Sequence, residues 1–170
     1  IKHALLRWSE DIDTIDDLDI LIFPDNFNSI RKLAKYSRTH NGVIVDLATT
    51  DGSELYGVKE PAYPVLLSCK WLNNSFVNKI GIRILSDNDQ FDALIYHVLF
   101  HKGFKTEIPL TPSNEEWRNN KYMNELNRIS NKLNINIENS LEGLLELADN
   151  RKITPSIDTL EKIARSNPFV

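Results

Sequence analysis

The segment Ile15–Phe23 is a hydrophobic run with carboxylates at its start, which predicts a β-strand. Because side chains alternate between the faces of a strand, Leu18, Ile20 and Ile22 point into a core, and Asp17 and Asp19 point to the other side. The run Val43–Ala48 predicts a second strand, because it is rich in β-branched residues and carries one charge, Asp46. Both predicted strands therefore present carboxylates from an otherwise apolar sheet.

Shorter elements are predicted around these two strands. Residues 4–6 have the character of the end of a strand, and residues 51–58 predict a hairpin that turns at an Asp-Gly pair. Residues 60–80 predict an irregular segment with one short helix. Residues 80–85 predict a further strand or an extended connector.

Residues 26–38 have the spacing of an amphipathic helix, for which Asp25 is a suitable N-cap. The polar face of this helix is basic, and we interpret it as solvated charge. The alternative is a surface near nucleotide phosphates. Binding of nucleic acid through the same face is disfavoured, because the net charge of the chain is −4.

The second half of the chain has the period of α-helices. The clearest predicted helix spans about 88–102 and ends with Gly103 at its C-cap. A capping box at 113–116 predicts a helix that runs to about 133. A third helix is expected at 140–149.

Two further caps are expected from the sequence. Asn139 and Glu142 are candidates to cap the helix at 140–149. Thr154-Pro155 is expected to open a last helix with proline at its first position, and Ile157 begins the apolar stripe of that helix. The resulting fold class is α+β, a small mixed β-sheet with helices packed on it, followed by a helical extension. We expect a core domain over 1–86 and a helical extension over 87–170 that packs on the core.

The composition of the 170 residues is that of a soluble globular protein, with 41% hydrophobic and 26% charged residues. The single cysteine, Cys69, argues against a disulfide scaffold and predicts a reducing, cytoplasmic compartment. No apolar run is long enough for a membrane span, and no signal peptide is visible. The chain begins at Ile1 and ends at Val170 in apolar segments, which suggests a domain of a longer protein.

The carboxylates Asp17, Asp19 and Asp46 are the candidate catalytic and metal-binding residues. Like charges held side by side repel, and a divalent cation such as Mg²⁺ relieves that repulsion. The alternative is a solvated acidic strand edge, because other aspartates lie nearby. Bound Mg²⁺ would clamp a triphosphate and neutralise the charge that develops in phosphoryl or nucleotidyl transfer. Asp46 would be a third ligand or the base that receives the proton of the acceptor, and Arg7 could reach phosphate oxygens.

A pair of histidines, His97 and His101, lies four residues apart in the helix predicted at 88–102, away from its apolar stripe. Two such histidines can bind zinc, but the metalloprotease motif requires a glutamate after the first histidine, and Val98 stands there. The other interpretation is that the two histidines form hydrogen bonds at the surface, or with residues that themselves contact a ligand. Neither histidine, nor the neighbouring Lys102, is assigned a role.

These residues together resemble the nucleotidyltransferase superfamily of DNA polymerase beta type. The resemblance rests on an apolar residue before Arg7-Trp8, an acidic spacer, Asp17-Leu18-Asp19-Ile20, a helix, and Val45-Asp46-Leu47. Three short segments of this chain, at 6–8, 96–103 and 153–160, are similar in sequence to nucleotidyltransferase-like domains of bacterial surface-polysaccharide gene clusters. The resemblance implies Mg²⁺-binding roles for the three aspartates. It also implies a nucleoside triphosphate or nucleotide-activated substrate and a hydroxyl acceptor on a sugar, polyol or protein.

One departure from the family pattern concerns the backbone at the triphosphate. The family has a glycine followed by glycine or serine, whereas this chain has Arg7-Trp8 or Trp8-Ser9 and no glycine before Gly42. Arg7 and Ser9 are the candidate phosphate-binding residues, as side-chain donors in place of backbone N–H groups. The chain is therefore expected to be a Mg²⁺-dependent nucleotidyltransferase. The alternative is an inactive docking or regulatory module of the same fold in a larger protein.

Overall fold

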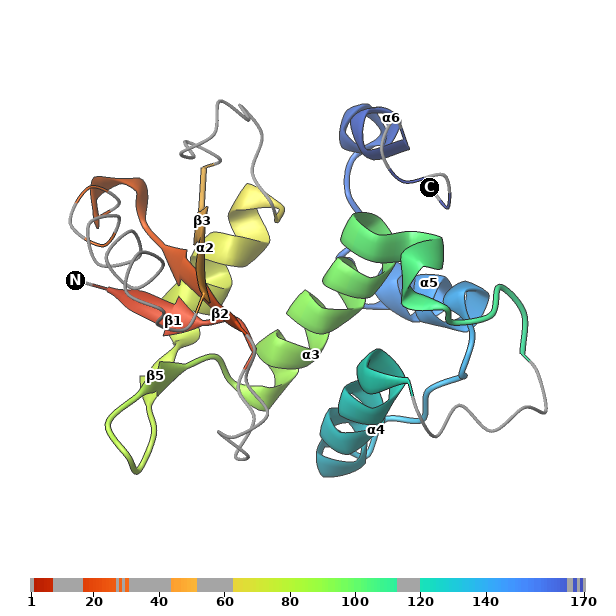
Figure 1. Cartoon of the computed structure of the whole chain (residues 1–170), viewed down its shortest axis with the longest axis horizontal. Coiled ribbons are helices and arrows are strands. Elements are labelled where there is room, and N and C mark those ends of the chain that lie inside the picture. Colours follow the sequence, from red (N-terminus) through yellow and green to blue (C-terminus); the bar gives the residue numbers. More distant parts are fainter. Residues whose placement is uncertain are drawn as a thin grey trace. The chain divides into compact units, whose positions relative to one another are not determined.

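The computed structural model describes residues 2–7, 17–26, 28, 30, 44–51, 63–112, 120–164, 167 and 169, without the side chains of Asp17 and Lys162. The chain forms two compact units, Ile1–Ser86 and Asp87–Val170 (Figure 1). The first unit contains the sheet and the second is helical. Within the described residues, none of the helices combines the length and the apolar character that crossing a bilayer requires.

Within the described residues of the first unit, the sheet has five strands in the order β3-β2-β1-β5-β4. Its antiparallel pairs are β1–β2 and β4–β5, and its parallel pairs are β1–β5 and β2–β3. The sheet is therefore mixed, and the predicted α+β class is confirmed. The strands are β1 (His3–Leu5), β2 (Asp17–Ile22), β3 (Ile44–Thr49), β4 (Phe76–Val77) and β5 (Arg83–Ile84).

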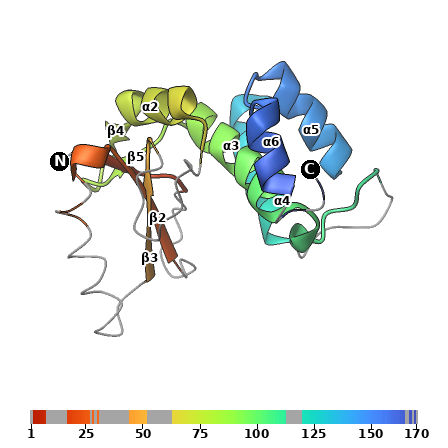
Figure 2. The same ribbon diagram turned by 90° about the horizontal axis from the view of Figure 1, so that it is seen from above.

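Helix α2 (Val65–Asn74) lies along one face of this sheet (Figure 2). It provides the short helix expected within 60–80. Trp71 and Leu72 of this helix are fully buried, and the hydroxyl of Ser68 donates a hydrogen bond to the carbonyl oxygen of Thr50 at the end of β3. Apolar burial and one polar contact therefore hold α2 beside the central strands.

The described residues of the helix predicted at 26–38 agree with it in part, because Asn28 and Ile30 are α-helical. Asp25, the predicted N-cap, lies inside the 3₁₀ helix η2 (Pro24–Asn26) that precedes them. Residues 31–38 of the predicted helix, and its basic face, lie outside the described residues, as does the hairpin predicted over 52–58.

The helical unit is built around α3 (Asp87–Tyr96), which continues into the π-helix η3 (His97–Lys102) and the 3₁₀ helix η4 (Gly103–Thr106). The predicted helix at 88–102 is therefore present, but its last turn is wider than an α-turn. The predicted apolar stripe is fully buried, at 2% exposure or less for each member: Phe91, Leu94, Ile95, Val98 and Leu99.

Helix α4 (Lys121–Leu133) begins later than predicted. Asn120 has an extended backbone, and its side-chain oxygen accepts hydrogen bonds from the N–H groups of Tyr122 and Met123 at 3.0 and 3.1 Å. A single helix from 113 to 133 is therefore wrong, because Asn120 is an N-cap within that span. The capping box at 113–116 lies outside the described residues.

The last two helices also begin at other residues than predicted. Ser140, rather than Asn139, caps α5 (Leu141–Asn150) by accepting a hydrogen bond from the N–H of Gly143 at 3.0 Å. Helix α6 (Ile157–Ala164) begins two residues after Pro155, which is buried. Ile157 is 75% exposed and does not belong to a buried stripe.

The end of the π-helix is closed by residues near the end of the chain. Gly103 has a φ of 52°, a value that side chains rarely permit, and this confirms the predicted glycine C-cap. The buried amide of Asn167 donates hydrogen bonds to the carbonyl oxygens of Leu99 and Phe100 at 2.8 and 3.1 Å. These carbonyls lie in the last turn, where intrahelical donors run out.

Candidate functional site

Asp19 and Asp46 are paired positions of two neighbouring parallel strands. Asp19 in β2 is in register with Asp46 in β3, within a ladder that runs from Asp17–Ile44 to Ile22–Thr49. Adjacent strands lie about 4.8 Å apart, and directly paired residues project to the same face of the sheet. Two carboxylates that are distant in the sequence are therefore neighbours in the sheet.

The two acidic positions lie at the open end of the ladder. Leu21 and Ile22 in β2 and Thr49 in β3 are buried, with exposures of 0%, 0% and 1%. Asp46 is exposed, and Asp19 is half-buried. Both strands therefore run from a solvent-accessible end that carries carboxylates to a closed end that carries core residues.

Asp46 is a charged residue in an apolar strand, and its exposure explains how the strand accommodates it. A carboxylate within a β-branched run would be costly to bury without a partner. Asp46 is exposed, as is Ile44 before it, so the strand imposes no such cost.

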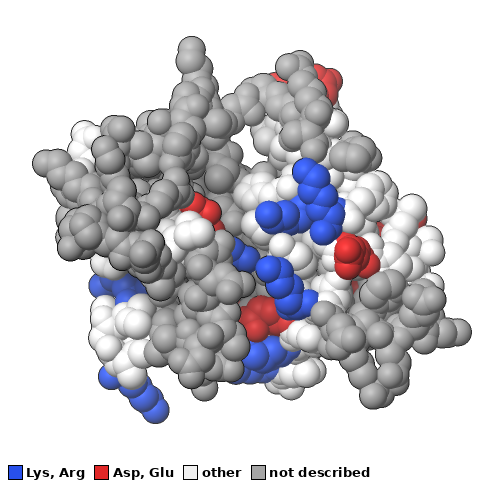
Figure 3. Space-filling model, in the orientation of Figure 1, with Lys and Arg blue, Asp and Glu red and all other residues white. Residues whose placement is uncertain are grey.

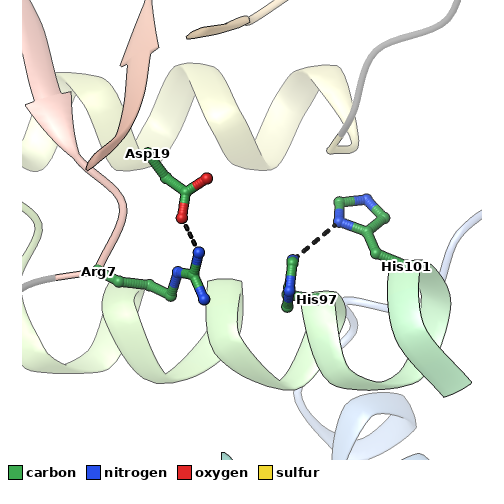
Figure 4. A network of polar contacts seen from close by, with 4 residues as sticks. All are labelled: Arg7, Asp19, His97 and His101. Atoms are coloured by element: carbon green, nitrogen blue, oxygen red, sulfur yellow. Dashed lines mark hydrogen bonds and ion pairs between the residues drawn. The ribbon is translucent and has the colours of Figure 1, made fainter. Parts of the chain in front are cut away.

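Arg7 forms an ion pair with Asp19. Its guanidinium Nη2 contacts the carboxylate Oδ2 of Asp19 (Figure 4), and the side chains are 30% and 20% exposed. The backbone supports this contact, because the N–H of Leu6 donates a hydrogen bond of 2.9 Å to the carbonyl oxygen of Asp19. The end of β1 thus continues along β2 and carries Arg7 to the acidic end of the sheet.

This ion pair changes the electrostatics of the site. Sequence reasoning assigned Arg7 to phosphate oxygens, and the structure shows it beside one of the candidate metal ligands. A guanidinium at this point compensates the charge of Asp19 and relieves its repulsion with the neighbouring Asp46. The structure thus places Arg7 at Oδ2 of Asp19.

The donor set suits a hard cation. Carboxylate oxygens on neighbouring strands are the ligands that Mg²⁺ takes, usually one or two of them with waters or phosphates. Asp17 is in register with Ile44, and its side chain lies outside the description, as does Ser9. Among the side chains that are described, no group of three or more His, Cys, Asp or Glu residues is placed to hold a metal ion.

A second polar cluster lies in the helical unit. The Nδ1 atoms of His97 and His101 are 3.2 Å apart in the π-helix (Figure 4). The four-residue spacing predicted that the rings are one turn apart, but not that two ring nitrogens are in direct contact. The contact depends on the π-helical turn, which the 3.6-residue spacing of hydrophobic residues does not predict.

The charges on the described surface are of both signs. On the face shown in Figure 3, groups of Lys and Arg side chains have Asp and Glu side chains beside them. This mixture accompanies a net charge of −4 for the whole chain. A mixed surface gives weak long-range attraction for a polyanion.

Comparisons of the chain with protein-family models, with curated proteins and with solved structures give no match. The geometry of the two clusters is therefore the structural basis for a functional proposal.

Proposed function

We propose that the first unit is a Mg²⁺-dependent nucleotidyltransferase-like domain that transfers a nucleotidyl or related phosphoryl group to a hydroxyl acceptor. The observation that carries the proposal is the register of Asp19 with Asp46 at the open end of two parallel strands. The resemblance of the Asp17-Leu18-Asp19 and Val45-Asp46-Leu47 motifs to the polymerase beta-type superfamily supports the same assignment. Surface-polysaccharide biosynthesis is the proposed context.

Each acidic residue has a role in this proposal. Asp19 and Asp46 would hold Mg²⁺, together with Asp17, and the ion would supply charge neutralisation at the transferred phosphorus. Because Asp46 is exposed, its carboxylate is also accessible to an acceptor hydroxyl and could receive the proton of that hydroxyl. These roles require positioning and charge rather than a covalent step on the protein.

Arg7 would have two states. Without nucleotide, its guanidinium pairs with Asp19. With metal and nucleotide present, the planar guanidinium would release the carboxylate and contact phosphate oxygens, which offer the same bidentate geometry. In such an exchange the metal ion would replace the guanidinium as the positive charge beside Asp19.

The test is calorimetric titration of the chain with ATP, GTP, CTP and UTP, each with and without Mg²⁺. We expect Mg²⁺-dependent binding of at least one nucleotide, weakened at least tenfold in Asp19→Asn and in Asp46→Asn. Asp25→Asn is the matched control, because Asp25 is an exposed aspartate of the same unit, in η2. Absence of Mg²⁺-dependent binding, or equal binding by all four proteins, would overturn the proposal.

A second candidate is the inactive docking or regulatory module of the same fold. The Arg7–Asp19 ion pair favours it, because a guanidinium already compensates a carboxylate that the reaction requires for metal binding. The absence of any glycine before Gly42 favours it as well. A product assay with each nucleotide and candidate acceptors separates the two, since only the enzyme releases pyrophosphate, from nucleotidyl transfer, or a nucleoside diphosphate, from phosphoryl transfer.

A further inference from the structure

His97 and His101 meet through their Nδ1 atoms, which are 3.2 Å apart. The ring planes are nearly perpendicular, at 85°, and the ring centroids are 5.2 Å apart. Both residues belong to η3, in which the wider π-turn replaces the α-helical turn. Single π-turns are rare in proteins and occur frequently at functional sites.

The separation of the two nitrogens matches that of two ligands of one metal ion. Imidazole nitrogens bind Zn²⁺ at about 2.0–2.1 Å, so two of them at a tetrahedral angle are about 3.3–3.4 Å apart. We propose that His97 and His101 form a chelating pair for a first-row transition-metal ion of the Zn²⁺ or Ni²⁺ class. Without metal, the same separation accommodates an Nδ1–H···Nδ1 hydrogen bond.

The surroundings orient both rings. The Tyr96 ring meets the His101 ring edge-on, with centroids 5.4 Å apart and planes at 81°, and the Tyr122 ring lies 6.0 Å from that of His97. The Nδ1 atom of His97 faces His101, and the Nε2 atom of the same His97 ring is buried. Both histidines are half-buried.

The backbone that carries the pair is held on both sides. Val98, Leu99 and Phe100, between the two histidines, are buried. Asn167 donates to the carbonyl oxygens of Leu99 and Phe100, which braces the π-turn from another segment of the chain. A chelating pair on a braced turn needs little reorganisation to bind an ion, and this lowers the entropic cost of binding.

The proposed centre has two protein ligands and open coordination positions. Among the described residues, no third His, Cys, Asp or Glu completes a metal-binding group. Water or a small bound molecule would fill the remaining coordination positions. The ligand atoms also separate this centre from the carboxylate site, since imidazole selects Zn²⁺ or Ni²⁺ and carboxylate selects Mg²⁺.

The test titrates the chain with ZnCl₂ and with NiCl₂ alone and follows calorimetry and thermal unfolding. We expect one ion per chain and a midpoint of unfolding that rises with metal concentration. His97→Gln and His101→Gln should each weaken binding at least tenfold. His3→Gln is the matched control, because His3 is a half-buried histidine of β1 in the other unit, and it should bind as the wild type does.

A measurement on the unaltered chain guards against variants that disturb the π-turn. Nitrogen-15 spectra of the four imidazoles should show a Zn²⁺-dependent change at Nδ1 of His97 and His101 and none at the other two histidines. Binding that persists in the His97→Gln/His101→Gln double variant, or spectra in which Zn²⁺ leaves both Nδ1 signals unchanged, would overturn the proposal. Asp19→Asn should retain Zn²⁺ binding, so this proposal and the nucleotidyltransferase proposal fail separately.

Discussion

The guanidinium of Arg7 and the carboxylate of Asp19 form an ion pair between the end of β1 and the acidic end of β2. The contact joins Arg7, which the sequence predicted to bind phosphate, with Asp19, which it predicted to bind a metal ion. Its strength and its effect on metal binding can be measured independently of any catalytic activity.

Replacement of Arg7 by methionine tests this contact. Arg7→Met should lower the free energy of unfolding by about 1 kcal/mol, because it leaves a half-buried carboxylate without its guanidinium. It should also raise the affinity for Mg²⁺ severalfold, since a competing cation is removed. Urea titration and calorimetry measure the two effects.

Lys2→Met is the matched control for Arg7→Met. Lys2 is a cation beside the same strand, and its ammonium donates a 2.9 Å hydrogen bond to Oδ1 of Asn73 rather than to a carboxylate. It should leave the affinity for Mg²⁺ unchanged. Equal Mg²⁺ affinities in all three proteins would show that Arg7 and a metal ion do not compete for Asp19.

The start of α4 can be tested at its cap. Asn120→Ala should cost about 1 kcal/mol of stability, because two N–H groups of the first turn lose their acceptor. The variant also loses the 2.7 Å hydrogen bond from Nδ2 of Asn120 to the carbonyl oxygen of Thr106. Asn131→Ala, at an exposed position near the end of the same helix, should change stability by less than about 0.5 kcal/mol. Urea denaturation compares the two, and equal losses would contradict the assigned cap.

Gly103 is predicted to be intolerant of a side chain for two separate reasons. Its φ is positive, and a Cβ atom there would lie 2.1 Å from Oδ1 of Asn167. Gly103→Ala should therefore cost about 2 kcal/mol or more, whereas Gly81→Ala should cost only about 1 kcal/mol. Gly81 also has a positive φ, but a Cβ atom there meets nothing within 4 Å.

Native-state hydrogen exchange suits this comparison, because the two glycines lie in different units and exchange reports local stability. A double-mutant cycle separates the two causes at Gly103. In an Asn167→Ala background, Gly103→Ala should cost less than in the wild type. Additive losses would show that overlap with Asn167 does not contribute.

Tyr96 predicts a loss of stability at high pH. Burial raises the pKa of the Tyr96 phenol well above its ordinary value near 10, because the ionised form is disfavoured away from water. The contribution is fully present below pH 10 and is lost as the pH rises towards the folded-state pKa, because the unfolded chain releases the proton first. The loss is up to about 1.4 kcal/mol per pH unit in this window.

Urea midpoints between pH 8 and 11.5 measure this loss, with Tyr96→Phe as the comparison. The variant should lose less stability than the wild type above pH 10, because its ring has no proton to release. Parallel pH profiles for the two proteins would contradict the assignment to Tyr96.

Local periodicity predicted most of the regular structure. The hydrophobic segment Ile15–Phe23 and the β-branched run Val43–Ala48 correspond to β2 and β3, and the helical period at 88–102 corresponds to α3 and η3. These patterns are visible because each element buries one face. The boundaries at Asn120 and Ser140 were missed, since other residues nearby have equal capping ability and only the fold selects among them.

The candidate site was predictable in composition and not in contacts. Strand alternation predicted that Asp17 and Asp19 share one face, but only the register of β2 with β3 shows that Asp46 is paired with Asp19. The partner of Arg7 could not be inferred, because phosphate and carboxylate are equally suitable for a guanidinium. The contact between His97 and His101 depends on a π-turn, which hydrophobic spacing does not encode.

The parallel pairing of β2 with β3 has a consequence for the order of folding. Strand β2 ends at Ile22, which pairs with Thr49, whereas β3 begins at Ile44, which pairs with Asp17 at the other end of β2. The chain must therefore return along the length of β2 before β3 can pair with it. Closing that crossover costs chain entropy before any ladder bond repays it, so this pairing is intrinsically slow to form. Asp19 and Asp46 consequently become neighbours only once this non-local step is complete, and an incompletely folded chain carries both aspartates without a site.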